Sequence, residues 1–203
     1  MIYFTSDLHF FHSRIIAYAK RPFQSVEEMD RQLIRNWNAR VSPDDEIYIL
    51  GDLTLKGPQY ANQILKQLQG RKYLLRGNHD FFADRASFRR DALVWVRDYC
   101  ELEYQGLSFV LCHYPLACWN GIREGAFQLH GHMHHSRAYN LRNRDGGVRQ
   151  FDVGVDANGM APVSIRELLD FWTEANPLVP EAPLDGHALP MQNHHAPQES
   201  GPA

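Results

Sequence analysis

The amino-acid sequence predicts an α/β fold with two β-sheets. Short apolar runs rich in β-prone residues alternate with helix-like segments in the first part of the 203-residue chain. The opening strand-helix-strand-helix-strand order implies that the first three strands pair in parallel. The later β-prone runs have fewer helices between them, which indicates a second sheet.

The predicted strands are residues 2–5, 47–50, 72–75, 108–112 and 127–129, with a weaker run at 148–153. No internal repeat is visible, and nothing divides residues 1–176, so we expect a single domain over that range. Residues 177–203 hold six of the 11 prolines and few large apolar residues. We expect this last segment to be a disordered tail.

Three helices are predicted from their caps and from apolar residues on one face. One extends from Pro58, a residue favoured at helix starts, to Gly70, which is typical of helix ends. The arginine-rich residues 137–149 are expected to be a solvated loop or hairpin rather than a basic rim. The other two helices begin at capping boxes, formed by Ser25 with Glu28 and by Ser164 with Glu167.

Composition excludes some classes of partner. The 21 basic and 24 acidic residues leave a formal net charge of -3, so no overall charge favours nucleic acid or an anionic membrane. No apolar run approaches the roughly 20 residues of a membrane span, and no basic region of a signal peptide precedes the first strand. Cys100, Cys112 and Cys118 form no CxxC motif, which suits a reducing compartment. We expect a cytoplasmic protein.

Residues that can coordinate a metal follow five of the predicted strands. The carboxyl ends of parallel strands face the ligand crevice of an α/β sheet, so side chains far apart in the sequence can converge there. Packing accident is a much weaker explanation for so many candidates at successive strand ends. The candidate ligands are Asp7, His9, Asp52, Asn78, His113, His132 and His134.

The types of ligand indicate the kind of metal. Carboxylate, amide and imidazole donors without a thiolate favour Mn, Fe, Ni, Co or Zn over a cysteine-based structural zinc site. Seven donors are too many for one ion with open positions, but they fit two ions if one carboxylate bridges them. Two divalent ions with two aspartates and a hydroxide would keep a net positive charge, which attracts phosphate in a protein that is acidic overall.

DxH, GD, GNHD, lone H and GHxH blocks occur here in that order, and each follows a predicted strand. In these blocks the sequence resembles the calcineurin-like metallophosphoesterase superfamily, in which they have the same order. The segments SDLHFFHSRII, RPF and WN resemble a small, mostly bacterial and phage branch. The blocks lie at residues 7–9, 51–52, 77–80, 113 and 131–134.

The resemblance implies a role for each candidate ligand. Asp7, His9, Asp52 and His134 would hold the first metal, and Asp52, Asn78, His113 and His132 the second, so that Asp52 bridges the two ions. His79 would be the acid that protonates the leaving group, with typically 10²–10⁴-fold effect on rate. Asp80 would orient the imidazole of His79, or it would be an exposed turn carboxylate.

The resemblance also implies the architecture and the chemistry. Two mixed β-sheets would pack as a sandwich with flanking helices, in the four-layer α/β/β/α fold of metallophosphoesterases. A metal-bridging hydroxide would attack phosphorus in line, while the ions neutralise charge on the equatorial oxygens.

Four further residues are candidate substrate contacts, each with a plainer alternative. His12 would line the pocket or cap the helix that follows it, and Arg14 would bind phosphate or lie on the surface. Tyr114 would stack on a base or ring, or belong to the core. His135 would face the substrate mouth or the solvent. His130 is not a candidate contact, and we expect it to form hydrogen bonds behind the ligands or to pack in the core.

The expected activity is that of a metal-dependent phosphoric ester hydrolase. A phosphodiesterase acting on a small or nucleotide-type substrate is favoured, and a phosphomonoesterase or nucleotide pyrophosphatase stays open. Phe10 and the GDLTLKG segment replace a glycine and a GDxxDRG block of the related protein phosphatases, which argues against phosphoprotein substrates. The alternative from another class is a non-catalytic scaffold that binds proteins.

Overall fold

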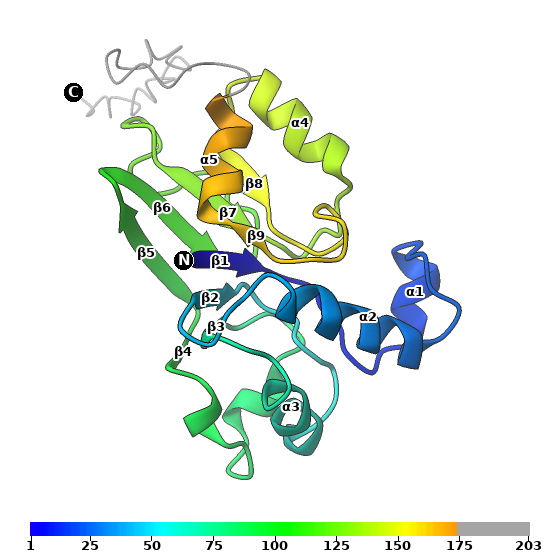
Figure 1. Ribbon diagram of the computed structural model, residues 1–203. Coiled ribbons are helices and arrows are strands. Elements are labelled where there is room, and N and C mark those ends of the chain that lie inside the picture. The colour runs from blue at the N-terminus through cyan, green and yellow to red at the C-terminus, as the bar shows by residue number, and fades with distance from the viewer. Residues whose placement is uncertain (174–203) are drawn as a thin grey trace, which may run out of the picture.

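The computed structural model describes residues 1–173, which form two β-sheets packed face to face with helices around them (Figure 1). The predicted α/β class and the two mixed sheets are confirmed. The predicted tail, residues 177–203, lies outside the described residues. No helix in the described part of the chain is long and apolar enough to cross a membrane.

The first sheet has five strands in the order β4-β3-β2-β1-β9. Strands β1 (Ile2–Thr5), β2 (Glu46–Ile49), β3 (Arg71–Leu75) and β4 (Trp95–Arg97) are parallel to one another, and β9 (Val163–Ser164) pairs with β1 antiparallel. The parallel pairing predicted for the first three strands is therefore present. Their carboxyl ends lie along one edge of the sheet.

The second sheet has four strands in the order β5-β6-β7-β8. β5 and β6 form an antiparallel hairpin whose loop residues, Gln105 and Gly106, have φ angles of 52° and 78°. These positive angles are those of a tight two-residue turn that matches the twist of the flanking strands. β6, β7 and β8 are parallel. The bounds are Tyr99–Tyr104, Leu107–Cys112, Phe127–His130 and Gln150–Asp152 for β5 to β8 in turn.

Side-chain alternation along β2 explains the layers. Ile47 and Ile49 point to one face and pack in a buried cluster with helices α2 (Val26–Asn38) and α3 (Pro58–Leu65). Tyr48 and Leu50 point to the other face. The second face packs against the inner side of the second sheet in a cluster that includes Phe109 and Phe127 from β6 and β7. Because both faces of β2 are buried, the strand is apolar at almost every position.

The helices cover the first sheet more completely than the second. α2 and α3 lie over the first sheet, and α4 runs beside β8 (Figure 1). Over the outer face of the second sheet, Val110 packs with Trp119 and Ala126 from the loop at 113–126. The helices are α1 (Arg14–Tyr18), α2 (Val26–Asn38), α3 (Pro58–Leu65), α4 (Arg137–Asp145) and α5 (Ile165–Thr173), with short 3₁₀ turns η1 (Phe81–Asp84) and η2 (Arg90–Ala92).

The structure differs from the sequence predictions in its strands and in two of its helices. The strands β4, β5 and β9 were not predicted, because two of them are very short and β5 exposes every second side chain. The loop or hairpin expected over residues 137–149 is helix α4, which has a polar surface and buries only Asn140. Asn140 bonds both the backbone nitrogen and oxygen of Asp152, so a polar contact rather than an apolar stripe fixes this helix. Helix α3 ends at Leu65, before Gly70.

The capping box of α2 gives a test of the local fold. The side chain of Ser25 accepts a hydrogen bond from the Glu28 amide at 3.2 Å, and Glu28 in turn accepts one from the Gln24 amide. Ser25→Ala should lower the free energy of unfolding by about 1 kcal/mol because an amide of the first turn loses its partner. Ser13 caps α1 without a side-chain hydrogen bond. Ser13→Ala is thus the matched control, and equal losses for the two variants in urea unfolding would contradict the capping role of Ser25.

Candidate metal centre

The loops that follow the strands are held together by backbone hydrogen bonds where the two sheets meet. The Asp7 amide donates to the Gly51 carbonyl at 3.1 Å, and the His9 amide donates to the Asp52 carbonyl at 3.0 Å. The His132 amide, from the second sheet, donates to the carboxylate of Asp7, from the first sheet, at 3.0 Å. The seven candidate ligands therefore come from both sheets and converge at one edge of the sandwich.

The backbone at these positions is strained. Five of the seven candidates have φ in the left-handed region, which residues with a Cβ seldom adopt. Such strain persists only where surrounding contacts enforce it, and it is concentrated at functional sites. The five are Asp7 (57°), His9 (51°), Asp52 (56°), His132 (72°) and His134 (50°).

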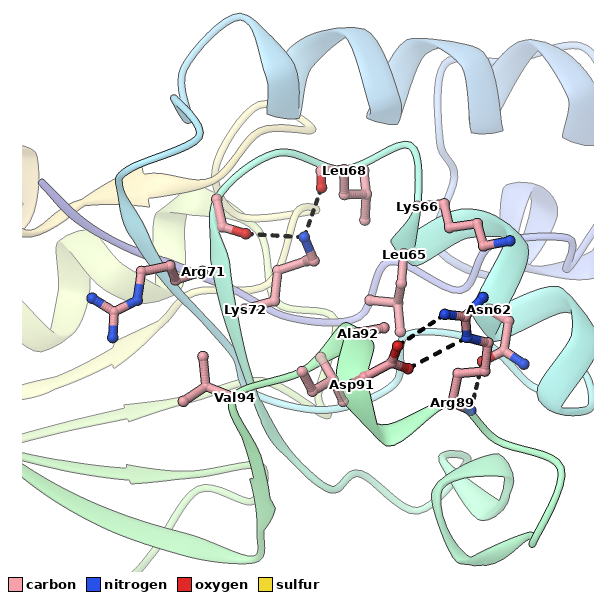
Figure 2. A pocket seen from close by; sticks show the side chains of 12 residues that line it. Asn62, Leu65, Lys66, Leu68, Arg71, Lys72, Arg89, Asp91, Ala92 and Val94 are labelled. Atoms are coloured by element: carbon pink, nitrogen blue, oxygen red, sulfur yellow. Dashed lines mark hydrogen bonds and ion pairs between the residues drawn. The ribbon is translucent and has the colours of Figure 1, made fainter.

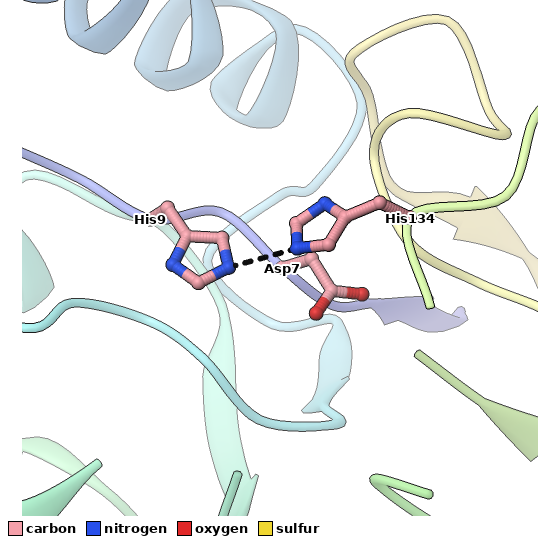
Figure 3. Close-up of side chains that lie close together, drawn as sticks. All are labelled: Asp7, His9 and His134. Atoms are coloured by element: carbon pink, nitrogen blue, oxygen red, sulfur yellow. Dashed lines mark hydrogen bonds between the residues drawn. The ribbon is translucent and has the colours of Figure 1, made fainter. Parts of the chain in front are cut away.

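One group of donors is formed by Asp7, His9 and His134, whose ligand atoms all lie within 4.8 Å of one another (Figure 3). The Nε2 atoms of His9 and His134 are 3.2 Å apart. The Oδ2 atom of Asp52 lies 3.5 Å from the same Nε2 of His9. This arrangement brings together the four residues expected to hold the first metal.

A second group of donors surrounds Asn78. The Oδ1 atom of Asn78 is 3.0 Å from Nε2 of His113 and 2.9 Å from Nδ1 of His132. Oδ2 of Asp52 is 3.7 Å from Nε2 of His113. Asp52 thus reaches both groups with the same oxygen, and Asp7 also lies with Asp52 and His113 in a cluster that could hold an ion.

In His113 and His134, a hydrogen bond at one ring nitrogen leaves the other nitrogen with a lone pair that points into the donor groups. Nδ1 of His113 lies 2.7 Å from the Leu50 carbonyl, and Nδ1 of His134 lies 2.7 Å from the carboxylate of Asp156. Both partners are acceptors, so each Nδ1 carries the proton and each neutral ring presents a bare Nε2. The Nε2 atom of His113 faces Oδ1 of Asn78, and the Nε2 atom of His134 faces Nε2 of His9. Donor atoms that share a cation are arranged in this way.

The charge of the buried groups also fits cations. Burial, reinforced by the neighbouring Asp152 and Asp52, raises the pKa of Asp7 well above its ordinary value. Burial and the nearby His134 lower the pKa of His9 to about 2, and burial lowers the pKa of His113. The neutral imidazoles provide no positive charge to balance the buried carboxylates. Divalent ions would supply that positive charge.

Two glycines allow the loops to approach this closely. A Cβ on Gly77 would collide with the Asp52 carboxylate, and a Cβ on Gly131 would collide with the Ser6 hydroxyl and the Asp7 carboxylate. The glycines of the GNHD and GHMH blocks are therefore required by close approach of backbone to ligand side chains.

His79 lies at the open side of the donor groups. Its side chain is 38% exposed, its Nε2 is 4.0 Å from Oδ2 of Asp52, and its ring centroid is 5.6 Å from that of His9. The amide of His79 donates to Oδ1 of Asp52 at 3.0 Å. An imidazole next to the donors and open to solvent has the position that an acid facing a leaving group needs.

Asp80 differs from both of its predicted settings. It is 2% exposed, so the exposed-turn alternative is wrong. Its carboxylate accepts hydrogen bonds from the amides of Asp52, Leu53 and Gly77, and no hydrogen bond within residues 1–173 joins it to the ring of His79. Burial raises the pKa of Asp80 to about 7. Through these hydrogen bonds, Asp80 connects the loop of the GD block to the loop of the GNHD block.

The candidate substrate contacts are in different settings. His12 packs its ring 5.7 Å from His9, and in the described residues no hydrogen bond joins its imidazole to α1, so the capping alternative is wrong. Arg14 is exposed at the start of α1. Tyr114 is 43% exposed beside His132, and its core alternative is wrong.

Two further histidines of the LHGHMHH segment have structural contacts. His130 is fully buried and contacts the Tyr139 hydroxyl at 3.1 Å, in agreement with the predicted core or hydrogen-bonding role. Nδ1 of His135 lies 3.0 Å from Asp152, and its ring stacks on Tyr139 at 3.7 Å. The side chain of His135 is 25% exposed, so these contacts hold it at a partly open position.

Sequence reasoning missed an ion pair that connects two of the loops. The buried guanidinium of Arg21 donates to the carbonyls of Asp7 and Leu8 at 2.5 and 3.0 Å, and it forms a bidentate pair with Asp156 at 2.8 and 2.9 Å. Asp156 also accepts from His134. Arg21 lies in the RPF segment, which indicated the branch but carried no assigned role, and Asp156 lies in the segment VGVDANG.

A cavity of about 470 Å³ lies away from these groups (Figure 2). It is lined by Arg71 and Lys72 at the start of β3, whereas Asn78 follows the end of that strand. The Lys72 ammonium is bonded to the carbonyls of Leu68 and Gly70, and Arg89 is paired with Asp91. Donor geometry, rather than this hollow, therefore locates the candidate site.

Comparison with known proteins identifies the family. The family model of calcineurin-like phosphoesterases matches residues 1–198. The chain belongs to the calcineurin-like phosphoesterase family. Two relatives from other organisms are the uncharacterized protein MJ1445 of Methanocaldococcus jannaschii, 37% identical over 166 residues, and the Gene 66 protein of Mycobacterium phage L5, 30% identical over 199 residues. The alignment with the first relative covers 81% of this chain and 86% of that relative. The alignment with the second covers 83% of this chain and 92% of that relative.

A solved structure agrees with this fold. The protein of unknown function AQ665 from Aquifex aeolicus is similar with a TM-score of 0.65 and 26% identity, over 84% of this chain and 98% of that one. The archaeal and phage relatives fit the small branch that the sequence motifs indicated. Within this calcineurin-like phosphoesterase, the family blocks coincide with the two donor groups.

The Asp156 carboxylate gives a prediction for metal binding. Asp156→Asn removes the charge that orients His134 and pairs with Arg21, so it should weaken divalent-ion binding at the group of Asp7, His9 and His134 about 10–100-fold. Binding at the group around Asn78 should be much less affected, because Asp156 has no hydrogen bond to that group in residues 1–173. Manganese titration followed by calorimetry measures the affinity.

Asp145→Asn is the control, because its side chain is 64% exposed and bonds only its neighbour Arg144 among the described residues. A manganese affinity that stays within twofold of wild type in Asp156→Asn would contradict the role of the carboxylate.

Proposed function

We propose that the protein is a binuclear, metal-dependent phosphodiesterase that acts on a small or nucleotide-type substrate. Family membership indicates a metal-dependent hydrolase of phosphoesters, with the Asp and His clusters as possible metal sites. Two ions and a diester substrate are the further parts of the proposal. One observation supports the two ions: Oδ2 of Asp52 lies 3.5 Å from Nε2 of His9 and 3.7 Å from Nε2 of His113, one residue of each donor group.

The residues of the chain divide the chemical tasks. When bound, two divalent ions would supply an activated water at neutral pH and positive charge for the phosphoryl oxygens. Asp52 would be shared between them, with the backbone amide of His79 holding its other oxygen. The exposed imidazole of His79 would donate a proton to the leaving oxygen.

Two features favour a diester over a monoester. A general acid is most useful when the leaving group is a poor alkoxide, and His79 is placed for that role. The buried arginine nearest to the loops, Arg21, is already bonded to Asp156 and to two carbonyls, so it does not offer a clamp for a phosphate dianion.

A cytoplasmic location belongs to the same proposal. Cys100, Cys112 and Cys118 are free thiols in the structure. Unpaired cysteines support a reducing compartment.

The activity is tested with two chromogenic esters. Chelator-treated protein is supplied with Mn, Fe, Ni, Co or Zn and assayed with bis-p-nitrophenyl phosphate and with p-nitrophenyl phosphate. We expect metal-dependent turnover with a higher kcat/KM for the diester. A higher kcat/KM for the monoester contradicts the diester preference and favours a monoesterase. Absence of turnover with every metal, together with less than one metal per chain, favours a non-catalytic scaffold.

His79→Ala tests the acid. The variant should keep both metals and lose roughly 10²–10⁴-fold in kcat for a diester with an alkyl leaving group, but much less with a nitrophenyl leaving group that needs no proton. Asp52→Asn should instead lose metals together with activity, because the shared ligand loses its charge. Metal content and the two rates are measured side by side. Equal losses with both leaving groups in His79→Ala would remove His79 from the acid role.

A further inference from the structure

Several large exposed hydrophobic side chains lie in the segments that carry or touch the donor groups. Single exposed apolar residues are ordinary on a protein surface, but a cluster of them marks a place of interaction. Of the nine exposed large hydrophobic residues that the structure describes, four belong to segments that carry or touch the candidate ligands. These four are Tyr18 (78% exposed), Phe81 (67%), Tyr114 (43%) and Met133 (51%).

Two of the four are tyrosines packed edge-on against candidate ligands. The ring of Tyr18 lies 6.0 Å from that of His134 at an interplanar angle of 84°. The ring of Tyr114 lies 4.7 Å from that of His132 and 5.0 Å from that of His113. Each tyrosine ring contacts a histidine with one of its edges or faces, and the rest of the ring is exposed to solvent.

The two tyrosines pack against different donor groups of the candidate metal centre. Tyr18 touches His134 in the first donor group, and Tyr114 touches His113 and His132 in the second. Asp52 joins the groups, so a phosphate bound between them would have one tyrosine toward each side. Met133, which lies between His132 and His134 in the sequence, is also exposed.

The fold does not require either ring to be exposed. Helix α1 is attached through Ile15, which is its buried residue, and the core gains nothing from a ring at Tyr18 that is 78% exposed. Tyr114 lies just beyond β6, outside the buried cluster of that strand. Aromatic rings have about 150–250 Å² to bury, so partners that cover them gain considerably.

We propose that the substrate is a phosphodiester with a planar aromatic base on each of its two arms, the chemistry of a dinucleoside monophosphate, with Tyr18 and Tyr114 each stacking on one base. This rests on the proposed phosphodiesterase function and names its substrate class. Stacking accepts any base, because every base has a π-face. A lipid-type diester has no ring to stack, and a cyclic mononucleotide has only one.

The test compares two diesters on the manganese-loaded protein. Adenylyl-3′,5′-adenosine carries two bases, and glycerophosphoethanolamine carries none. In the wild type the first should have a KM at least tenfold lower. Tyr18→Ala and Tyr114→Ala should each raise its KM roughly 5- to 150-fold, the range of a lost base stack. The KM for glycerophosphoethanolamine should rise much less in the same variants, so that the ratio of the two KM values falls toward one.

Three control variants separate stacking from other effects. Tyr18→Phe and Tyr114→Phe keep the rings and should restore the low KM, which a need for the hydroxyl group would not allow. Val94→Ala removes an exposed apolar side chain at the start of β4, at the other end of the sheet, and should leave the KM ratio as in the wild type. A readout without turnover is calorimetry with adenosine 5′-monophosphate and with inorganic phosphate, whose difference in affinity should shrink in both alanine variants.

The outcomes distinguish the substrate class from the activity. Equal KM values for the two diesters in the wild type, or an effect of one tyrosine only, would overturn the two-base substrate while hydrolysis of bis-p-nitrophenyl phosphate keeps the phosphodiesterase. Loss of binding in the phenylalanine variants would overturn stacking. Failure to hydrolyse any phosphoester with any metal would overturn the phosphodiesterase and, with it, the substrate class.

Discussion

The buried negative charge of Asp7 and Asp52 is the constraint to which the rest of the site responds. Both carboxylates lie in the seam between two sheets and are almost completely removed from water. A buried carboxylate is costly unless it is paired or coordinates a metal. The hydrogen bonds from the amides of His132 and His79 satisfy part of this need, and the remaining oxygens face neutral imidazole nitrogens. The same charge that makes the site costly in isolation makes it attractive to divalent ions.

A second layer of carboxylates fixes the loops that carry the first. Asp80 gathers three amides from two loops, and Asp156 joins His134 to Arg21, which in turn holds the backbone of Asp7. These contacts hold the left-handed backbone of the ligand positions in place. A catalytic site needs its groups within fractions of an ångström of the productive geometry, and such supporting contacts are what provide it.

Sequence patterns predicted the parts of the molecule that depend on apolar periodicity and on motif order. The strands β1, β2, β3, β6 and β7 and the convergence of the seven candidate ligands could be read in advance, because each strand is apolar and ends at a polar motif. Helix α4 could not be predicted in this way, because the hydrogen bonds of Asn140, rather than an apolar face, attach it to the rest of the fold. Nor could the setting of Asp80 or the Arg21 and Asp156 pair, because their partners are backbone atoms and residues up to 135 positions away.

The origin of the donors in both sheets has a mechanical consequence. Asp7 and His9 are separated from His134 by most of the folded chain, so any ion held among them would act as a cross-link that closes a very long loop. Separation of the sheets would require that cross-link to open, and occupied ion sites would therefore raise the resistance of the sandwich to unfolding. Catalytic competence and mechanical cohesion of the two layers would then depend on the same few bonds.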